Sequence, residues 1–88
     1  MQIESTDMAF CIRIEKVSET EVEAIFDFFP DATPKRYGRI KLDKMTGTVN
    51  EMTGCPGDLN ATFFNRAAMK LIQHHLRADY PQITYWES

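Results

Sequence analysis

Residues 59–78, LNATFFNRAAMKLIQHHLRA, are the stretch that decides the fold. Their apolar side chains recur at steps of three and four residues, which places them on one face of a helix. The positions on this face are Leu59, Phe63, Phe64, Ala67, Ala68, Leu71, Ile72, His75 and Leu76. The pattern predicts an amphipathic helix of about five turns, with Asp58 as its N-cap. Residues 79–81 should end it, because proline disfavours helical angles in the residue before it.

Segments upstream of this helix alternate apolar and polar residues with the period of a strand. The first covers residues 8–17 and the second residues 22–28. In an antiparallel hairpin the numbers of any two paired residues add up to the same value. With a value of 38 the apolar residues of both strands lie on one face, and burial of that face specifies the register. This hairpin pairs Phe10 with Phe28, Ile12 with Phe26 and Ile14 with Ala24.

Two prolines within residues 30–34 end the second strand. Alternation resumes over residues 37–43, and residues 43–47 predict a turn in which Gly47 supplies a positive φ. Residues 48–52 then return as an edge strand, and residues 83–86 form a short last strand. The order β-β-β-β-α-β predicts an α+β fold, with an antiparallel sheet of four to five strands and one amphipathic helix packed on one face.

The length of 88 residues allows one domain, spanning residues 1–88. The polar residues 1–7 are expected to be frayed. No apolar run approaches the roughly 18–20 residues that a membrane span needs, and the start MQIESTDM lacks the basic-then-apolar order of a signal peptide. We therefore expect a cytoplasmic protein of bacterial or phage type that makes no membrane contact.

The cysteines and histidines predict neither a metal site nor a cofactor. Cys11 and Cys55 lie 44 positions apart, which fits no redox or metal motif. Reduced thiols are expected, with a Cys11–Cys55 disulfide as the alternative. His74 and His75 are adjacent, so a helix points them about 100° apart, and no third ligand lies three or four residues away. An enzyme is the less favoured class, because no nucleophile elbow or phosphate-binding glycine loop is present.

The net charge of −3 conceals a strong asymmetry along the chain. Residues 1–34 carry −6, residues 35–47 carry +4 and residues 48–88 carry −1. The acids of the first hairpin are predicted to gather on its solvent face and tip and to bind a basic protein partner. Such a module would act as an inhibitor or immunity-type binder. The predicted partner-binding residues, with two aromatic residues of the last strand, are Glu15, Glu19, Glu21, Glu23, Asp27, Tyr85 and Trp86.

The alternative is a nucleic-acid-binding accessory domain built on the basic hairpin at residues 35–44. Basic and aromatic residues interleave there, as phosphate neutralisation and base stacking require. Pairing of the second and third strands argues against this alternative, because acids of one strand would neutralise cations of the other. If paired residue numbers add to 66, Asp27 lies opposite Arg39; if they add to 64, Glu23 lies opposite Lys41. The residues of this alternative are Lys35, Arg36, Tyr37, Arg39 and Lys41 with the helix cations Arg66, Lys70 and Arg77, which share their helix face with His74.

Two further expectations concern apolar residues and sheet edges. Phe26, Phe28, Phe63 and Phe64 are predicted to lie in the core. Phe29 and Ile25 should leave apolar area on the charged face of the hairpin, because alternation points them away from Phe28. A homodimer is a third possibility for function, since residues 48–52 or 82–86 could pair with a second copy at a sheet edge.

Overall fold

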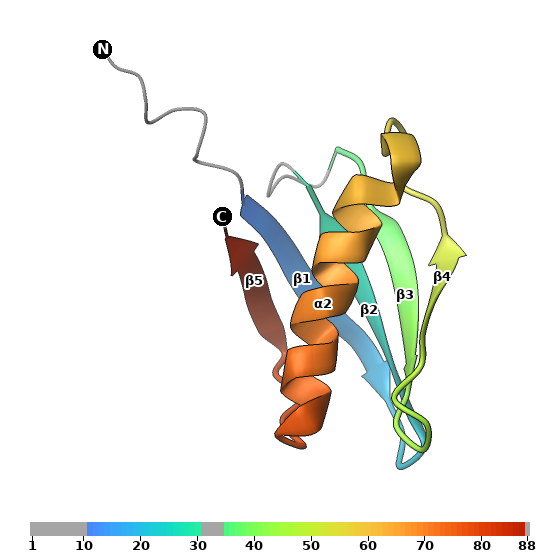
Figure 1. Cartoon of the computed structure of the whole chain (residues 1–88), viewed down its shortest axis with the longest axis vertical. Coiled ribbons are helices and arrows are strands. Elements are labelled where there is room, and N and C mark those ends of the chain that lie inside the picture. The colour runs from blue at the N-terminus through green and yellow to red at the C-terminus, as the bar shows by residue number, and fades with distance from the viewer. Residues whose placement is uncertain (1–10, 31–34, 88) are drawn as a thin grey trace.

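The computed structural model describes residues 11–30 and 35–87, so Phe10 and the predicted frayed segment at residues 1–7 lie outside the described residues. The described part is one antiparallel sheet with a helix across one face (Figure 1). The strands are β1 (Cys11–Glu19), β2 (Glu23–Phe29), β3 (Gly38–Asp43), β4 (Val49–Thr53) and β5 (Ile83–Glu87). Helix α2 (Thr62–Leu76) follows a short 3-10 turn, η1 (Leu59–Ala61). The predicted α+β class, strand count and single covering helix are confirmed.

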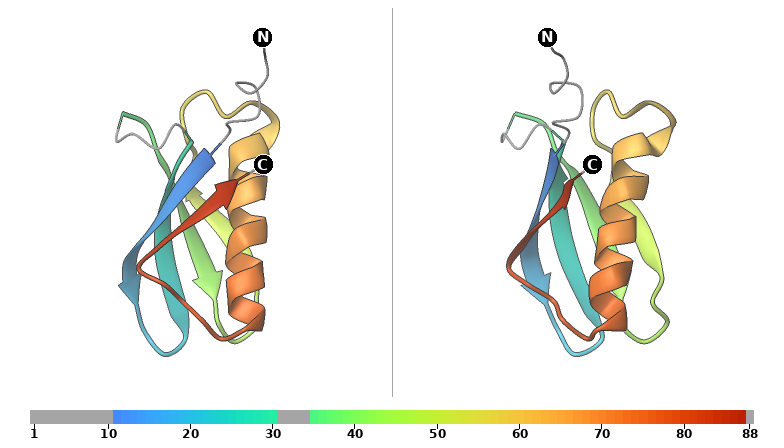
Figure 2. Two further views of the ribbon diagram at one scale, coloured as in Figure 1. Left: turned by 90° about the vertical axis from the view of Figure 1, so that its left-hand side faces the viewer. Right: turned by 60° about the vertical axis from the view of Figure 1, so that its left-hand side comes forward.

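The sheet order is β4-β3-β2-β1-β5. The first four strands form a meander, and α2 carries the chain back so that β5 pairs with β1 (Figure 2). Strands β4 and β5 are therefore the two edges, which confirms the predicted edge position of the 48–52 segment. The turn before β4 has Gly47 at a φ of 76°, as predicted.

The core lies between the sheet and α2. Apolar residues of β1, β2 and β3 alternate toward the helix, which meets them with Ala67 and Leu71. Phe63 and Phe64 are partly buried against this core, as is Trp86 from β5. The buried sheet residues are Ile12, Ile14, Ala24, Phe26, Phe28, Ile40 and Leu42.

The predicted register of the first hairpin is wrong by four residues. Ile14 pairs with Phe28, rather than with Ala24, and Lys16 pairs with Phe26. The apolar faces still coincide, because a shift by an even number of residues keeps every side chain on its face. The difference arises because β1 continues to Glu19 and the chain turns at residues 20–22. Val22 consequently lies in the turn, 53 % exposed, instead of on the apolar face.

A β-bulge interrupts β1 at Val17. Lys16 pairs with Phe26, whereas Ser18 pairs with Ile25, so Val17 is one extra residue in the ladder. An extra residue reverses the alternation of every side chain beyond it. Glu19 therefore shares the helix-facing side of the sheet with its partner Ala24. Nothing in the apolar pattern of this segment predicts this reversal.

In the ladder between β2 and β3 the numbers of paired residues add to 66, which is the first of the two predicted registers. Asp27 lies opposite Arg39, and Glu23 lies opposite Asp43 rather than Lys41. Gly38 lies opposite Phe28, and a Cβ atom at Gly38 would come within 2.4 Å of the Phe28 ring. Glycine at this position therefore gives Phe28 the room to enter the core.

Among the residues that the structure describes, no helix lies on the sheet face away from α2 (Figure 2). Phe29 lies on this face but is only 9 % exposed, which corrects the prediction of an exposed ring. The guanidinium of Arg13 lies 4.8 Å from the Phe29 ring centroid, and the Tyr37 ring lies 5.9 Å away. These two side chains cover Phe29 in place of a second layer of secondary structure. Ile25, farther along β2 on the same face, is half-buried.

The helix is shorter than predicted, and its buried face is narrower. Leu59 and Leu76 are each 79 % exposed, which corrects their assignment to the apolar face. Leu59 precedes the helix, and Leu76 is turned away from the buried Leu71 at about 100° per residue. His74 is buried at 8 % exposure, whereas His75 is only half-buried. The predicted positions of the two histidines are thus exchanged.

The predicted N-cap of the helix is wrong, because Ala61 and not Asp58 is the N-cap residue of α2; the Asp58 side chain nevertheless binds the first turn of the helix. Asn60 and Ala61 adopt left-handed angles, with φ of 61° and 55°, and Ala61 is the residue before the first helical one. The Asp58 carboxylate accepts hydrogen bonds from the backbone N–H groups of Phe63 (2.8 Å) and Phe64 (3.0 Å). The side chain thereby satisfies two of the donors that a helix start leaves open.

Both cysteines are free thiols, so the predicted alternative of a disulfide is not formed. Cys55 is buried at the rim of the core. Cys11 is half-buried on the uncovered face, where burial and the negative charge of Glu87 raise its pKa. A raised pKa keeps the thiol protonated and unreactive at neutral pH.

The helix ends in a Schellman motif that has alanine where glycine is preferred. The Ala78 N–H donates to the His75 carbonyl (2.9 Å) and the Asp79 N–H to the His74 carbonyl (3.0 Å). Ala78 has a φ of 52°, a left-handed conformation that glycine adopts without the steric cost of a Cβ atom.

The substitution Ala78→Gly should therefore raise the free energy of unfolding by about 0.5–1 kcal/mol, measured by urea denaturation. The matched control, Gln73→Gly in the exposed helix interior, should lower it by about the same amount. A decrease for Ala78→Gly would show that the left-handed angle carries no strain.

Candidate interaction surface at the turn end of the sheet

Two turns lie side by side at one end of the sheet, which we call the turn end. They are the β1–β2 turn at residues 20–22 and the β3–β4 turn at residues 44–48. The Lys44 N–H donates to the Val22 carbonyl (2.9 Å), and the Lys44 Nζ atom donates to the Thr20 carbonyl (2.7 Å). The C-terminal end of α2 lies at this same end of the molecule (Figures 1 and 2).

Each turn is fixed by a side chain that accepts backbone hydrogen bonds. The Thr20 hydroxyl accepts from the N–H groups of Val22 and Glu23, both at 3.2 Å. The Asp43 carboxylate accepts from the N–H groups of Met45 (2.8 Å) and Thr46 (3.2 Å). Such short polar side chains replace ladder hydrogen bonds where a strand ends, so the backbone of both turns is well defined.

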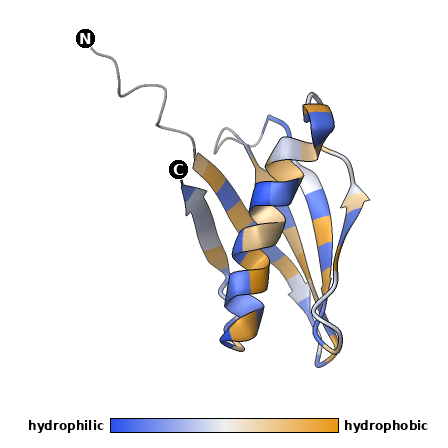
Figure 3. Ribbon diagram, in the orientation of Figure 1, coloured by the Kyte–Doolittle hydropathy of each residue, from blue (hydrophilic) through white to orange (hydrophobic). Residues whose placement is uncertain are grey.

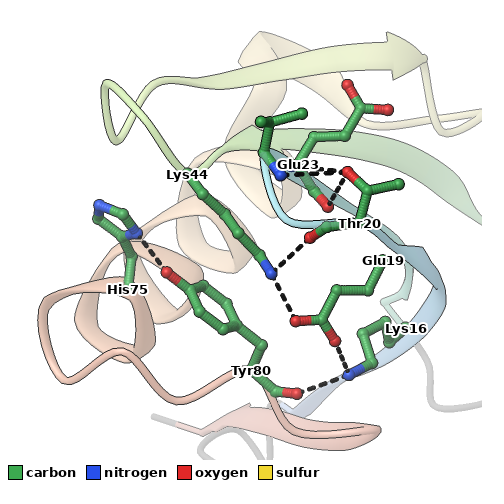
Figure 4. A network of polar contacts seen from close by, with 8 residues as sticks. Lys16, Glu19, Thr20, Glu23, Lys44, His75 and Tyr80 are labelled. Carbon is green, nitrogen blue, oxygen red and sulfur yellow. Dashed lines mark hydrogen bonds and ion pairs between the residues drawn. The ribbon is translucent and has the colours of Figure 1, made fainter.

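Glu19 lies at the centre of a polar network on the helix-facing side of the turn end. The bulge at Val17 turns it there, and its two carboxylate oxygens accept hydrogen bonds from Lys16 and Lys44 (Figure 4). The two lysine side chains are only 17 % and 14 % exposed. These hydrogen bonds lower the pKa of Glu19, because they stabilise its charged form.

The same network holds the segment that follows α2. The Lys16 Nζ atom donates to the Tyr80 carbonyl (2.8 Å), and the Lys44 Nζ atom lies 4.4 Å from the centroid of the Tyr80 ring. The Tyr80 hydroxyl is 2.8 Å from His75 Nδ1 (Figure 4). Strand β1, both turns and the end of α2 are thus joined by polar contacts.

Uncompensated acids lie on the other side of the turn end. Glu23 and Asp43 are opposite each other in the β2–β3 ladder, and Glu21 precedes them at the tip. None of the three forms an ion pair within residues 11–30 and 35–87. Val22 and Met45 beside them are 53 % and 75 % exposed. We call these residues the acidic turn surface: Glu21, Val22, Glu23, Asp43 and Met45.

Three of the five predicted hairpin acids form ion pairs with cations of the same chain. Glu15 forms an ion pair with Arg13 (2.8 Å), and Glu19 lies between two lysines. Asp27 accepts two hydrogen bonds from the Arg39 guanidinium, at 2.7 and 3.1 Å. The structure therefore brings Glu21 and Glu23 together, adds Asp43 and removes the other three acids from the free charge of the hairpin. Asp43 is not among the partner-binding residues predicted from the sequence, because residues 43–47 are interpreted there only as a turn.

Tyr85 and Trp86 lie on opposite faces of β5 and form no common surface. Tyr85 is 43 % exposed on the uncovered face, across from Arg13. Trp86 packs against the core, and the Arg66 guanidinium lies 4.9 Å from its ring. Adjacent residues of a strand point to opposite faces, so the two aromatic residues serve different parts of the structure.

The residues of the nucleic-acid alternative are divided between two layers. Tyr37, Arg39 and Lys41 belong to the uncovered side of the sheet, since Ile40 and Leu42 between and beyond them point into the core. Lys35 is exposed before β3. The helix cations Arg66, Lys70 and Arg77 lie on α2, on the other side of the sheet.

Several of these cations also have partners within the chain. Arg36 donates to the Pro56 carbonyl (2.9 Å) and lies 5.4 Å from the Phe63 ring. Arg39 is held by Asp27, and Arg66 lies over Trp86. Internal partners reduce the charge that these side chains can offer to a phosphate backbone.

His74 lies beside the helix cations, as predicted, with an Arg77 guanidinium nitrogen 3.4 Å from its Nδ1 atom, but it is buried against β5. Its Nε2 atom is 2.8 Å from the Thr84 hydroxyl. Burial is the main cause that lowers the pKa of His74, and the nearby cations Lys70 and Arg77 add to it. His74 is therefore neutral at pH 7 and acts as a polar contact between α2 and β5.

The part of the chain that the structure describes encloses no pocket and holds no group of three potential metal ligands. None of its helices is long and apolar enough to cross a membrane. No protein-family model matches the sequence, and neither a curated protein nor a solved structure matches it.

The substitution Glu19→Gln should lower the free energy of unfolding at pH 7 by about 0.5–1 kcal/mol. Lys16 and Lys44 lose their anionic partner, but Glu19 itself is exposed, so solvent screens the two ion pairs. The folded state lowers the pKa of Glu19, so this stability is present above the ordinary pKa of about 4.3. It is lost as the pH falls through the lowered value.

Urea denaturation between pH 7 and pH 3 measures this effect, and the difference between wild type and Glu19→Gln should narrow as the pH falls. Glu21→Gln, at the exposed tip of the same turn, should change stability little at any pH. Equal stabilities of wild type and Glu19→Gln at pH 7 would show that the network does not hold the turn end.

Proposed function

We propose that this protein is a protein-interaction module whose acidic turn surface binds a partner with a basic surface. The observation that carries the proposal is the placement of Glu23 directly opposite Asp43 with no cation paired to either among the described residues. Like charges opposite each other in a sheet are unfavourable by a few tenths of a kcal/mol to about 1 kcal/mol. Local arrangements that oppose stability are typical of functional sites.

The neighbouring residues support binding in two ways. Val22 and Met45 add two exposed apolar side chains to the surface, and interfaces commonly combine apolar and charged residues. The backbone beneath them is fixed by Thr20, Asp43 and the network around Glu19. A surface that is already ordered loses less conformational entropy on binding.

A basic partner fits this surface better than a nucleic acid does. The acids that lack an ion-pair partner among the described residues would steer a cationic protein toward the turn end, whereas they would repel phosphates. In this proposal the protein acts in the cytoplasm, where Cys11 and Cys55 stay reduced. It covers a basic site of its partner in the manner of an inhibitor or immunity-type binder.

Reversing both tip charges, in the variant Glu21→Lys/Glu23→Lys, should slow association with the partner about tenfold and flatten its salt dependence. The partner is obtained by affinity capture on the wild-type protein, and association is followed by surface plasmon resonance between about 50 and 300 mM salt. The matched control is Glu51→Lys/Glu87→Lys, which makes the same change in net charge away from the turn end and should slow association far less.

Equal effects of the two double variants would overturn the proposal, because net charge alone would then explain binding. A second arm measures the fluorescence anisotropy of a labelled single-stranded oligonucleotide at about 50 mM salt. Binding of the oligonucleotide that Lys41→Glu abolishes would favour the nucleic-acid alternative instead.

A further inference from the structure

Strand β5 is an edge of the sheet, and the outer side of its backbone is open. Among the described residues its only neighbour in the sheet is β1 (Figure 1). The Lys16 N–H donates to the Gln82 carbonyl (2.8 Å), in the same register as the rest of the β1–β5 ladder. Hydrogen-bonded pairs alternate along an antiparallel ladder. The backbone N–H and C=O groups of Ile83 and Tyr85 therefore point outward, away from β1.

The two edges of the sheet differ in how well they can accept another strand. In β4, Met52 is one extra residue in the ladder with β3, so this edge contains a bulge, and the charged Glu51 lies beside it. Bulges and charged side chains protect an edge against pairing. Strand β5 pairs with β1 without a register shift and contains neither proline nor lysine. Figure 3 shows strongly hydrophilic residues within β4 and mostly intermediate colours along β5.

Two large apolar side chains lie beside the open backbone of β5. Ile83 is 49 % exposed and Tyr85 is 43 % exposed, and both lie on the uncovered face, because residues two apart in a strand share a face. Glu87, the only charged residue of β5, lies at the end of the strand. An occupant of this edge therefore needs a strand backbone with apolar side chains at alternate positions.

We propose that the protein forms a two-fold homodimer in which β5 pairs antiparallel with β5 of a second copy. Ile83 of one copy lies opposite Tyr85 of the other, and the two-fold axis passes beside Thr84. Because Ile83 and Tyr85 both have outward backbone groups, each such pair exchanges two hydrogen bonds across the interface. The pairing also covers the exposed side chains of both copies, since an aromatic residue opposite a β-branched one is a favourable cross-strand pair.

Charge favours an antiparallel pair of copies over a parallel one. In the antiparallel dimer the two Glu87 residues lie at opposite ends of the interface. A parallel pair in register would bring Glu87 of both copies together, and neighbouring like charges are unfavourable. The antiparallel dimer is also a closed assembly, because each copy contributes its one open edge and the bulged β4 remains on the outside.

A strand of a different protein is the other class of occupant for an open edge. Its backbone could bond to β5 equally well, but it would have to supply apolar side chains at the two positions that face Ile83 and Tyr85. A second copy supplies both side chains in matching order from its own sequence. The second copy is therefore the better fit.

The dimer does not depend on the acidic turn surface. A two-fold axis perpendicular to the sheet places the turn ends of the two copies at opposite ends of the joined sheet. Both acidic turn surfaces consequently remain accessible, and Glu21→Lys/Glu23→Lys should leave association of the copies unchanged. This result separates the test of the dimer from that of the proposed function.

Sedimentation equilibrium of the full chain measures association between about 10 µM and about 1 mM protein, because a contact between two short strands is smaller than a standard interface and should be weak. The wild type should change from monomer to dimer over this range. Tyr85→Pro removes an outward N–H and leaves the ladder with β1 intact, so it should weaken association at least tenfold. Circular dichroism confirms folding. If Tyr85→Pro unfolds, Ile83→Lys/Tyr85→Lys serves instead, because it sets lysine opposite lysine in the dimer.

The matched control is Glu51→Pro at the other edge of the sheet. The Asp43 N–H donates to the Thr48 carbonyl (2.8 Å), so alternation along the ladder points the Glu51 N–H away from β3. Glu51→Pro thus also removes an outward N–H, and it should leave association unchanged.

A pair of single variants tests the register. Ile83→Glu and Tyr85→Lys should each weaken association, because a charge replaces an apolar contact. An equimolar mixture of the two variants should associate about fivefold more tightly than either alone, because the new carboxylate then faces the new ammonium group. No gain on mixing would overturn the proposed pairing of Ile83 with Tyr85.

Three further results would overturn the proposal. A wild-type protein that stays monomeric at 1 mM would show that the edge does not pair with its own copy. Equal weakening of the dimer by Tyr85→Pro and Glu51→Pro would show that association does not use β5 specifically. A dimer that Leu76→Gln abolishes and Tyr85→Pro leaves intact would assign association to the exposed side of α2.

Discussion

The rest of the structure depends on one extra residue in β1. Val17 is a bulge, and it reverses the alternation of the side chains that follow. Glu19 consequently points to the helix side of the sheet, where Lys16 and Lys44 bind it. This small ionic centre aligns both turns and, through Tyr80, positions the end of α2. Without the bulge, Glu19 would join Glu15 on the uncovered face and the two lysines would lack an anion.

Most of the fold follows from periodicity, whereas the register of the first hairpin does not. A period of two identifies the strands and steps of three and four identify α2, so the order of elements and the α+β class could be predicted. The predicted register, with paired residue numbers adding to 38, and the observed one, with 42, bury the same faces of β1 and β2. The apolar pattern therefore cannot decide between the two registers. Hydrogen bonds of the Thr20 side chain, which fix where the chain turns, decide between the two.

The candidate surfaces were predictable only in part, for the same reason. Glu21 and Glu23 follow from charge patterning, but the partner that joins them, Asp43, depends on the β2–β3 register. Leu71 and Ile72 are adjacent and both apolar, so sequence alone does not say which of them faces the sheet. Burial resolves this choice in favour of Leu71, which is fully buried while Ile72 is 39 % exposed.

The position of β5 has a consequence for the order of folding. Strands β1 to β4 pair with neighbours in the chain, but β5 must return to β1, where Glu87 lies opposite Cys11. Contacts between such distant residues form slowly, because a long loop must close first. During synthesis β1 therefore remains an unpaired edge until β5 has emerged. For that interval its backbone is open to pairing with other chains, a hazard that ends when the sheet gains its last strand.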